Sequence, residues 1–145
     1  MKVTAAVLNS LSAYQFVVIF ARYNGKWLYC RAKDRDTYET AGGHIEEGES
    51  AFQAATRELY EETGALSFDI EAVFDYTVLR EEGLSYGQVY LAKIHELGSM
   101  PDFEMAELVL LEGIPQKMRF PEILPELFNE LQSCLKSQAA SSNLL

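Results

Sequence analysis

The stretch from residue 43 to residue 65 constrains the fold most strongly, because it marks both ends of a helix. Ser50, followed three residues later by Gln53, fits a capping box, and Gly64 can adopt the left-handed conformation that ends many helices. These signals predict a helix over residues 51–63. Three apolar side chains fall on one side of this helix and are expected to face the core: Phe52, Ala55 and Leu59.

Three glutamates, Glu58, Glu61 and Glu62, occupy the arc beside that apolar stripe. Their spacing makes them neighbours on the helix, and like charges at this spacing cost a few tenths of a kcal/mol per pair. A solvated acidic face is the simpler interpretation and the one that spacing alone favours. The alternative is a site for a hard divalent cation, which binds carboxylates together with the phosphate oxygens of a substrate.

The rest of the chain predicts one layered α+β domain over residues 1–136. Asn24-Gly25 between two β-branched and aromatic runs indicates a hairpin of strands at 15–23 and 26–33. Further strands are expected at 66–79 and 86–94, on either side of a loop, and at 107–111. An amphipathic helix is expected at 121–136, followed by a disordered tail over residues 137–145.

The composition excludes some classes of binding partner and indicates the cellular compartment. A net charge of -10 disfavours binding to a nucleic-acid polymer, which depends on clustered lysine and arginine. The sequence has no run of the ~20 apolar residues needed to cross a bilayer. Cys30 and Cys134 are far apart in the sequence and resemble neither a metal motif nor a disulfide framework. We therefore expect a cytoplasmic protein that acts on a small molecule.

The acidic helix is part of a longer pattern that begins at Gly43. Five residues separate Gly43 from Glu49, seven more precede Arg57-Glu58, and Leu59, Glu61-Glu62 and Gly64 follow. This pattern resembles the Nudix box at every fixed position, and a match of this length is specific. The resemblance implies an α/β/α sandwich with a mixed central sheet. It also implies hydrolysis of a phosphoanhydride bond in a nucleoside diphosphate derivative, with Mg²⁺ or Mn²⁺.

The resemblance also assigns roles to individual residues. Glu58, Glu61 and Glu62 would be metal ligands, together with the Gly43 carbonyl, and Arg57 would orient the acidic cluster with Glu49. Glu61 and Glu62 are candidates for the strongest ligands and for proton acceptors. Some members of the family take a general base from a later loop, where this chain has two candidates, Glu104 and Glu107. The alternative for both is a solvated loop residue.

The substrate depends on residues outside the box. Ala41 and Ala65 stand where the family more often has a proline and a larger aliphatic residue, so the shape of the pocket is open. No proline occurs between Gly64 and Met100, which disfavours ADP-ribose and NADH. The stretch 118–121 resembles compact bacterial nucleoside triphosphate pyrophosphatases, including those that remove oxidised guanine nucleotides. Nucleotide sugars, dinucleoside polyphosphates, an isopentenyl diphosphate isomerase and a non-catalytic ligand sensor are the alternatives, in a monomer or a homodimer.

Overall fold

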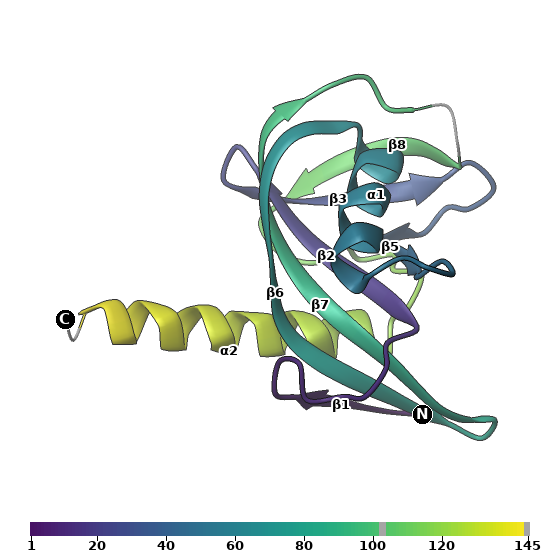
Figure 1. Ribbon diagram of the computed structural model, residues 1–145. Coiled ribbons are helices and arrows are strands. Elements are labelled where there is room, and N and C mark those ends of the chain that lie inside the picture. Colours follow the sequence, from purple (N-terminus) through teal and green to yellow (C-terminus); the bar gives the residue numbers. More distant parts are fainter. Residues whose placement is uncertain (102–103, 144–145) are drawn as a thin grey trace.

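The computed structural model describes residues 1–101 and 104–143. The chain forms eight named strands and two α-helices in this part (Figure 1). The strands are β1 (Lys2–Ala6), β2 (Phe16–Tyr23), β3 (Lys26–Ala32), β4 (Tyr38–Glu39), β5 (Ala41–His44), β6 (Ala65–Arg80), β7 (Gly83–Leu97) and β8 (Met105–Leu111). The helices are α1 (Ala51–Thr63) and α2 (Leu124–Asn143).

All of these strands belong to one mixed sheet in the order β1-β6-β7-β2-β3-β4, with β5 beside β2 and β8 beside β3. The pair β2–β7 is parallel, whereas the other pairs of named strands are antiparallel. A parallel pair needs a long crossover connection. Here the crossover contains α1, which brings the predicted acidic helix onto the sheet.

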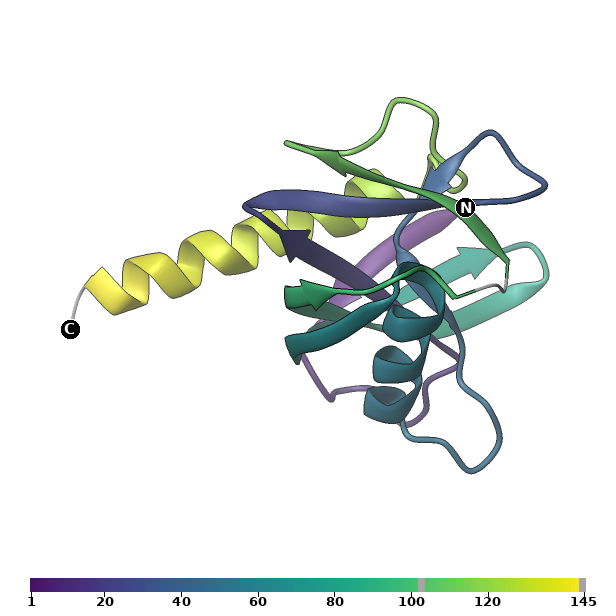
Figure 2. The same ribbon diagram turned by 90° about the horizontal axis from the view of Figure 1, so that it is seen from above.

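The two helices cover opposite faces of the sheet (Figures 1 and 2). Side chains alternate along β2, so Val17 and Ile19 join the apolar cluster that contains Leu59 of α1. Phe20 points to the other face and joins the cluster that contains Leu127 of α2. The mixed sheet between two helices confirms the expected α/β/α sandwich.

Several local predictions are confirmed. Asn24 and Gly25 connect β2 to β3 with φ angles of 53° and 77°, as a type I′ turn requires. The helix α1 begins and ends where its caps predict, with the reciprocal Ser50–Gln53 bonds present and Gly64 at φ 80°. One detail of the prediction for this helix was wrong: Phe52 is 51% exposed, and Ala54 lies in the core instead.

The predicted loop at residues 80–87 is wrong. β6 and β7 form one long hairpin in which Arg80 already pairs with Gly83, so only Glu81 and Glu82 make the turn. Residues 83–87 have a weak apolar pattern, but backbone pairing along the whole hairpin keeps them in a strand. The edge strand β1 was not predicted, because cross-strand pairing with β6 holds it in place although its residues are mostly exposed.

The C-terminal helix extends into the stretch 137–145, for which the sequence predicts a disordered tail. α2 begins at Leu124 and continues beyond residue 136, and Figure 1 shows it projecting past the sheet. Residues 137–143 contain neither glycine nor proline, so extending an existing helix adds a hydrogen bond per residue without a new nucleation step. Residues 144–145 of the predicted tail lie outside the described part. None of the helices in residues 1–101 and 104–143 has the length and apolar content needed for a bilayer span.

Candidate active site

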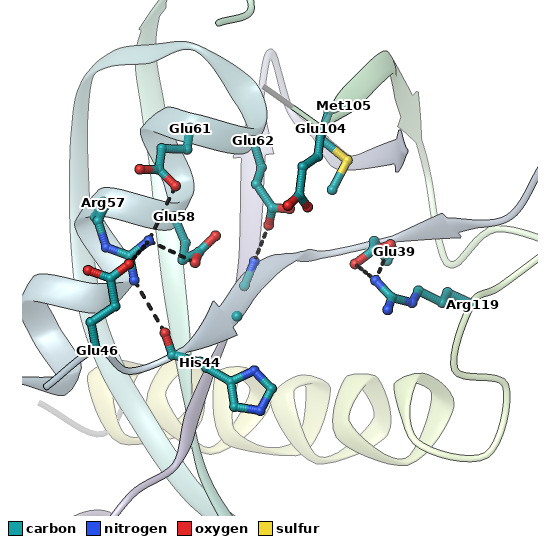
Figure 3. A pocket seen from close by; sticks show the side chains of 12 residues that line it. Glu39, His44, Glu46, Arg57, Glu58, Glu61, Glu62, Glu104, Met105 and Arg119 are labelled. Atoms are coloured by element: carbon teal, nitrogen blue, oxygen red, sulfur yellow. Dashed lines mark hydrogen bonds and ion pairs between the residues drawn. The ribbon is translucent and has the colours of Figure 1, made fainter. Parts of the chain in front are cut away.

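An acidic cavity of about 470 Å³ lies between α1, β5, the end of β4 and the residues that lead into β8 (Figure 3). Six glutamates line it: Glu39, Glu46, Glu58, Glu61, Glu62 and Glu104. Two arginines, Arg57 and Arg119, line it as well. The cavity therefore has the negative potential that the sequence pattern of α1 predicts.

The burial of α1 turns its glutamates toward this cavity. Ala55 and Leu59 are fully buried against the sheet, which fixes the rotation of the helix. Glu62 is 8% exposed as a result, and the side chains of Glu58 and Glu61 are 13% and 33% exposed. A solvated acidic face would leave all three carboxylates in water, so that interpretation does not describe this helix.

Arg57 connects the glutamates to one another. Its Nε and Nη2 donate to the two carboxylate oxygens of Glu49 at 2.8 and 3.0 Å. Its Nη1 donates to Glu58 at 2.9 Å and to Glu61 at 3.2 Å. The hydrogen bond from Arg57 lowers the pKa of Glu49. The fork of Arg57 thus holds the acidic cluster in register with Glu49, in the arrangement that the sequence predicts.

The paired glycines allow β5 to approach both β2 and α1 closely. A Cβ atom on Gly42 would lie 2.4 Å from the Val17 carbonyl oxygen, and one on Gly43 would lie 2.5 Å from Glu58 Oε1. Gly42 also donates its backbone N–H to Glu62 Oε1 at 2.7 Å. A Cβ at Gly42 would therefore force β5 away from β2, and a Cβ at Gly43 would displace the Glu58 carboxylate.

The cavity holds more negative charge than its own cations neutralise. Burial, together with the nearby charges of Glu58, Glu39 and Glu104, raises the pKa of Glu62 to about 8 against the opposing Gly42 hydrogen bond. Burial also raises the pKa of Glu58, although Arg57 opposes this shift. Carboxylates in such surroundings favour the arrival of a proton or a cation.

The oxygen-rich donor set suits a hard divalent cation. However, no group of three or more acidic, histidine or cysteine side chains within residues 1–101 and 104–143 is already arranged to enclose a metal ion. The contacts of Arg57 explain this, since its Nη1 binds both Glu58 and Glu61. A cation would replace part of these contacts while the Glu49 bonds keep Arg57 in place. The residues therefore fit a divalent cation after a small rearrangement of the carboxylates.

The structure separates the two candidates for a general base. Glu104 lines the cavity, and Figure 3 shows its carboxylate beside that of Glu62. Glu107 lies outside the cavity wall, where it accepts a hydrogen bond from the Tyr38 hydroxyl and has Arg31 Nε 3.9 Å away. Only Glu104 is thus placed to act on a molecule in the cavity.

The pair formed by Glu39 and Arg119 was not predicted from the sequence. Glu39 is 8% exposed, and Arg119 Nη1 lies 3.1 Å from each of its carboxylate oxygens. Burial raises the pKa of Glu39, and the Arg119 contact opposes that shift. Eighty positions separate the two residues, so no local spacing could have revealed the pair. The one signal available in the sequence was a glutamate in the otherwise uncharged stretch 37–43.

Comparisons with known proteins identify the family. A family model described as NUDIX domain matches residues 13–120. YtkD of Bacillus subtilis (strain 168), provisionally named an 8-oxo-dGTP diphosphatase, is 37% identical over 103 residues, or 70% of this chain. The match covers 65% of YtkD, so the chain spans just under two thirds of this relative's length.

Solved structures agree with that family. A crystal structure of a mutant of the Bacillus subtilis pyrophosphohydrolase BsRppH has a TM-score of 0.78 and 27% identity, and the match covers 94% of this chain and 90% of that one. A UDP-X diphosphatase structure has a TM-score of 0.72 at 17% identity, with coverage of 90% and 66%, and shares the fold alone. The chain shares the mixed sheet between two helices with these structures, and its own acidic cavity lies beside α1. The family model covers most of the chain, so the chain belongs to the Nudix family.

Proposed function

We propose that this protein hydrolyses a phosphoanhydride bond of a nucleoside triphosphate, including its oxidised guanine form, with Mg²⁺ or Mn²⁺. The observation that carries the proposal is the set of carboxylates on α1, which face one cavity and are held in register by Arg57. The name of the relative YtkD supports the choice of a nucleoside triphosphate.

Glu58, Glu61, Glu62 and the Gly43 carbonyl would hold the metal. Gly43 supports this assignment, because it lets the backbone lie directly against the Glu58 carboxylate. When bound, the cation neutralises phosphate oxygens and favours attack by water. The roles of the protein side chains can be stated separately from that contribution.

Arg57 keeps Glu58 and Glu61 from turning into solvent, so a cation meets ligands that are already close together. Glu104 is the proton acceptor in this scheme, because its carboxylate lies in the cavity and its neighbours are acidic. A carboxylate in that position can take the proton that the attacking water releases. Glu107, committed to Tyr38 and Arg31, has no part in this step.

The test is turnover of a substrate panel by the purified protein with Mg²⁺ and with Mn²⁺. The panel contains the common nucleoside triphosphates, 8-oxo-dGTP, ADP-ribose, a nucleotide sugar and a dinucleoside polyphosphate, and released phosphate and pyrophosphate are measured. We expect the triphosphates to be the best substrates. Turnover of none of the compounds, with tight binding of one of them, would instead identify a ligand sensor.

Two variants link the activity to the site. Glu61→Gln should lower kcat/KM at least 100-fold, since loss of a direct ligand removes stabilisation of the transition state. Glu126→Gln is the matched control, because Glu126 is an exposed glutamate of α2 outside the cavity. A Glu61→Gln rate within threefold of the parent would exclude Glu61 as a ligand.

A further inference from the structure

The wall that Glu39 and Arg119 form lies at the far end of the cavity from Arg57. Figure 3 shows Arg57 and Arg119 at opposite ends, with Glu58, Glu62 and Glu104 between them. A nucleotide whose phosphates lie against the α1 glutamates must place the rest of its structure elsewhere in the cavity. The Arg119 end is a part of the cavity wall that the phosphate chemistry does not use.

The backbone and a neighbouring ring hold Arg119 in position before any ligand binds. Tyr38 of β4 accepts a hydrogen bond from the Arg119 N–H at 2.9 Å and donates its own N–H to the Lys117 carbonyl at 2.8 Å. The guanidinium lies 4.7 Å from the centre of the Phe120 ring. Together with the Glu39 contacts, these interactions fix the plane of the guanidinium.

Among the described residues, only one nitrogen of this fixed guanidinium takes part in hydrogen bonds. Nη1 is bound to Glu39, whereas Nε and Nη2 have no hydrogen-bond partner among residues 1–101 and 104–143. Glu39 also balances the charge of Arg119. A neutralised pair is a poor receptor for a phosphate, but it presents hydrogen-bond donors beside an acceptor, as a nucleobase edge requires.

We propose that Arg119, held by Glu39, reads the base of the substrate by donating hydrogen bonds to the O6 side of guanine. The proposal rests on the proposed function in taking a nucleotide as the ligand. Guanine presents the acceptors O6 and N7 on one edge, and paired arginine donors match them, whereas the oxidised base carries N–H at N7 and would accept from Arg119 through O6 alone. Adenine has an amino group in place of O6, so donor would face donor. Arg119 thereby makes the site selective for guanine nucleotides.

The test measures binding of nucleoside monophosphates, which have no phosphoanhydride bond to cleave. GMP and AMP are titrated into the protein with Mg²⁺ by calorimetry. We expect the parent to bind GMP about tenfold more tightly than AMP, in line with the discrimination of one paired arginine contact. Arg119→Ala should bring the two affinities within threefold by weakening GMP alone.

Arg119→Lys separates the hydrogen-bonding fork from its charge. Lysine keeps the positive charge but lacks the planar pair of donors, so the preference for GMP should fall as it does in Arg119→Ala. Arg22→Ala is the matched control, since Arg22 also lies over an aromatic ring, Trp27, and lies outside the cavity. The control should keep the parent's ratio, and circular dichroism should show that every variant is folded.

Three results would overturn the proposal: equal binding of GMP and AMP by the parent, an unchanged ratio in folded Arg119→Ala, or a preference for GMP that Arg119→Lys retains. The second result includes equal weakening of GMP and AMP in Arg119→Ala, which would assign Arg119 to the phosphate. Failure of the proposed function would give a different set of results. The substrate panel would show no triphosphate turnover, whereas the preference for GMP would still depend on Arg119.

Discussion

Replacing Asp75 should lower the free energy of unfolding more than a comparable replacement at the protein surface. Asp75 is a fully buried carboxylate on β6. It accepts hydrogen bonds from the Ser10 N–H at 2.9 Å, the Tyr14 hydroxyl at 2.7 Å and Gln88 Nε2 at 2.9 Å. These contacts attach the connection between β1 and β2 to the centre of the sheet.

The magnitude follows from the donors that the change would leave behind. Asp75→Ala removes the acceptor for these three donors and for the longer contact from the Leu11 N–H at 3.3 Å. Each of the three closer donors costs roughly 1–2 kcal/mol when unsatisfied, which gives a loss of about 3–6 kcal/mol. At about 2–4 °C per kcal/mol for a domain of this size, Tm should fall by roughly 10 °C. Urea unfolding followed by circular dichroism measures the loss. Asp69→Ala, an exposed aspartate on the same strand, is the control and should change stability by at most about 0.5 kcal/mol.

The pH dependence provides a second measure of the same interaction. Burial alone would raise the pKa of Asp75, but the hydrogen bonds from Tyr14 and Gln88 outweigh it and lower that pKa below 3.8. The stabilisation is therefore complete above pH 3.8 and is lost as the pH falls through the folded-state pKa. The difference in unfolding free energy between the parent and Asp75→Asn should narrow over that range. A loss below about 1 kcal/mol in Asp75→Ala, or a difference that does not change with pH, would refute this reasoning.

Three more predictions concern the cavity. Gly43→Ala should lower kcat/KM at least tenfold, because its Cβ would lie 2.5 Å from Glu58 Oε1, whereas Gly113→Ala, where a Cβ meets no atom within 4 Å, should not. Arg57→Lys should lower kcat/KM by at least tenfold in steady-state assays, because lysine cannot hold Glu49, Glu58 and Glu61 at once. Glu104→Gln should lower kcat by about 100-fold and Glu107→Gln by less than threefold, so the reverse order would exclude Glu104 as the base.

The features that sequence predicted well are those whose cause is local. The ends of α1 depend on Ser50, Gln53 and Gly64, each within a few positions of the backbone groups that it satisfies. The hairpin at Asn24-Gly25 likewise depends on two adjacent residues that adopt positive φ angles. Arg57 and Glu49 are eight positions apart, and both belong to the pattern that resembles the Nudix box. The resemblance was therefore enough to predict their contact.

The features that sequence missed depend on tertiary contacts. Phe52 satisfies the helical period for the core, but the packing of α1 on the sheet buries Ala54 and leaves Phe52 half exposed. Glu39 and Arg119 meet because residues 117–119 pair with β4, a contact that no periodicity encodes. The same reasoning explains why Glu104 and Glu107 could not be separated by sequence. They are three positions apart, and only the course of β8 decides which of them faces the cavity.

The charges of the cavity also decide how a substrate can enter it. Arg57 supplies one positive charge to Glu49, Glu58 and Glu61, and Arg119 is already balanced by Glu39. Glu62 has no cation within salt-bridge distance among the described residues and accepts only the Gly42 N–H. A polyphosphate alone would meet net repulsion there, since like charges in a partly desolvated site interact strongly. In the proposed function these carboxylates would hold a divalent cation that offsets the repulsion, so the α1 glutamates would be needed for binding of the substrate as well as for its cleavage.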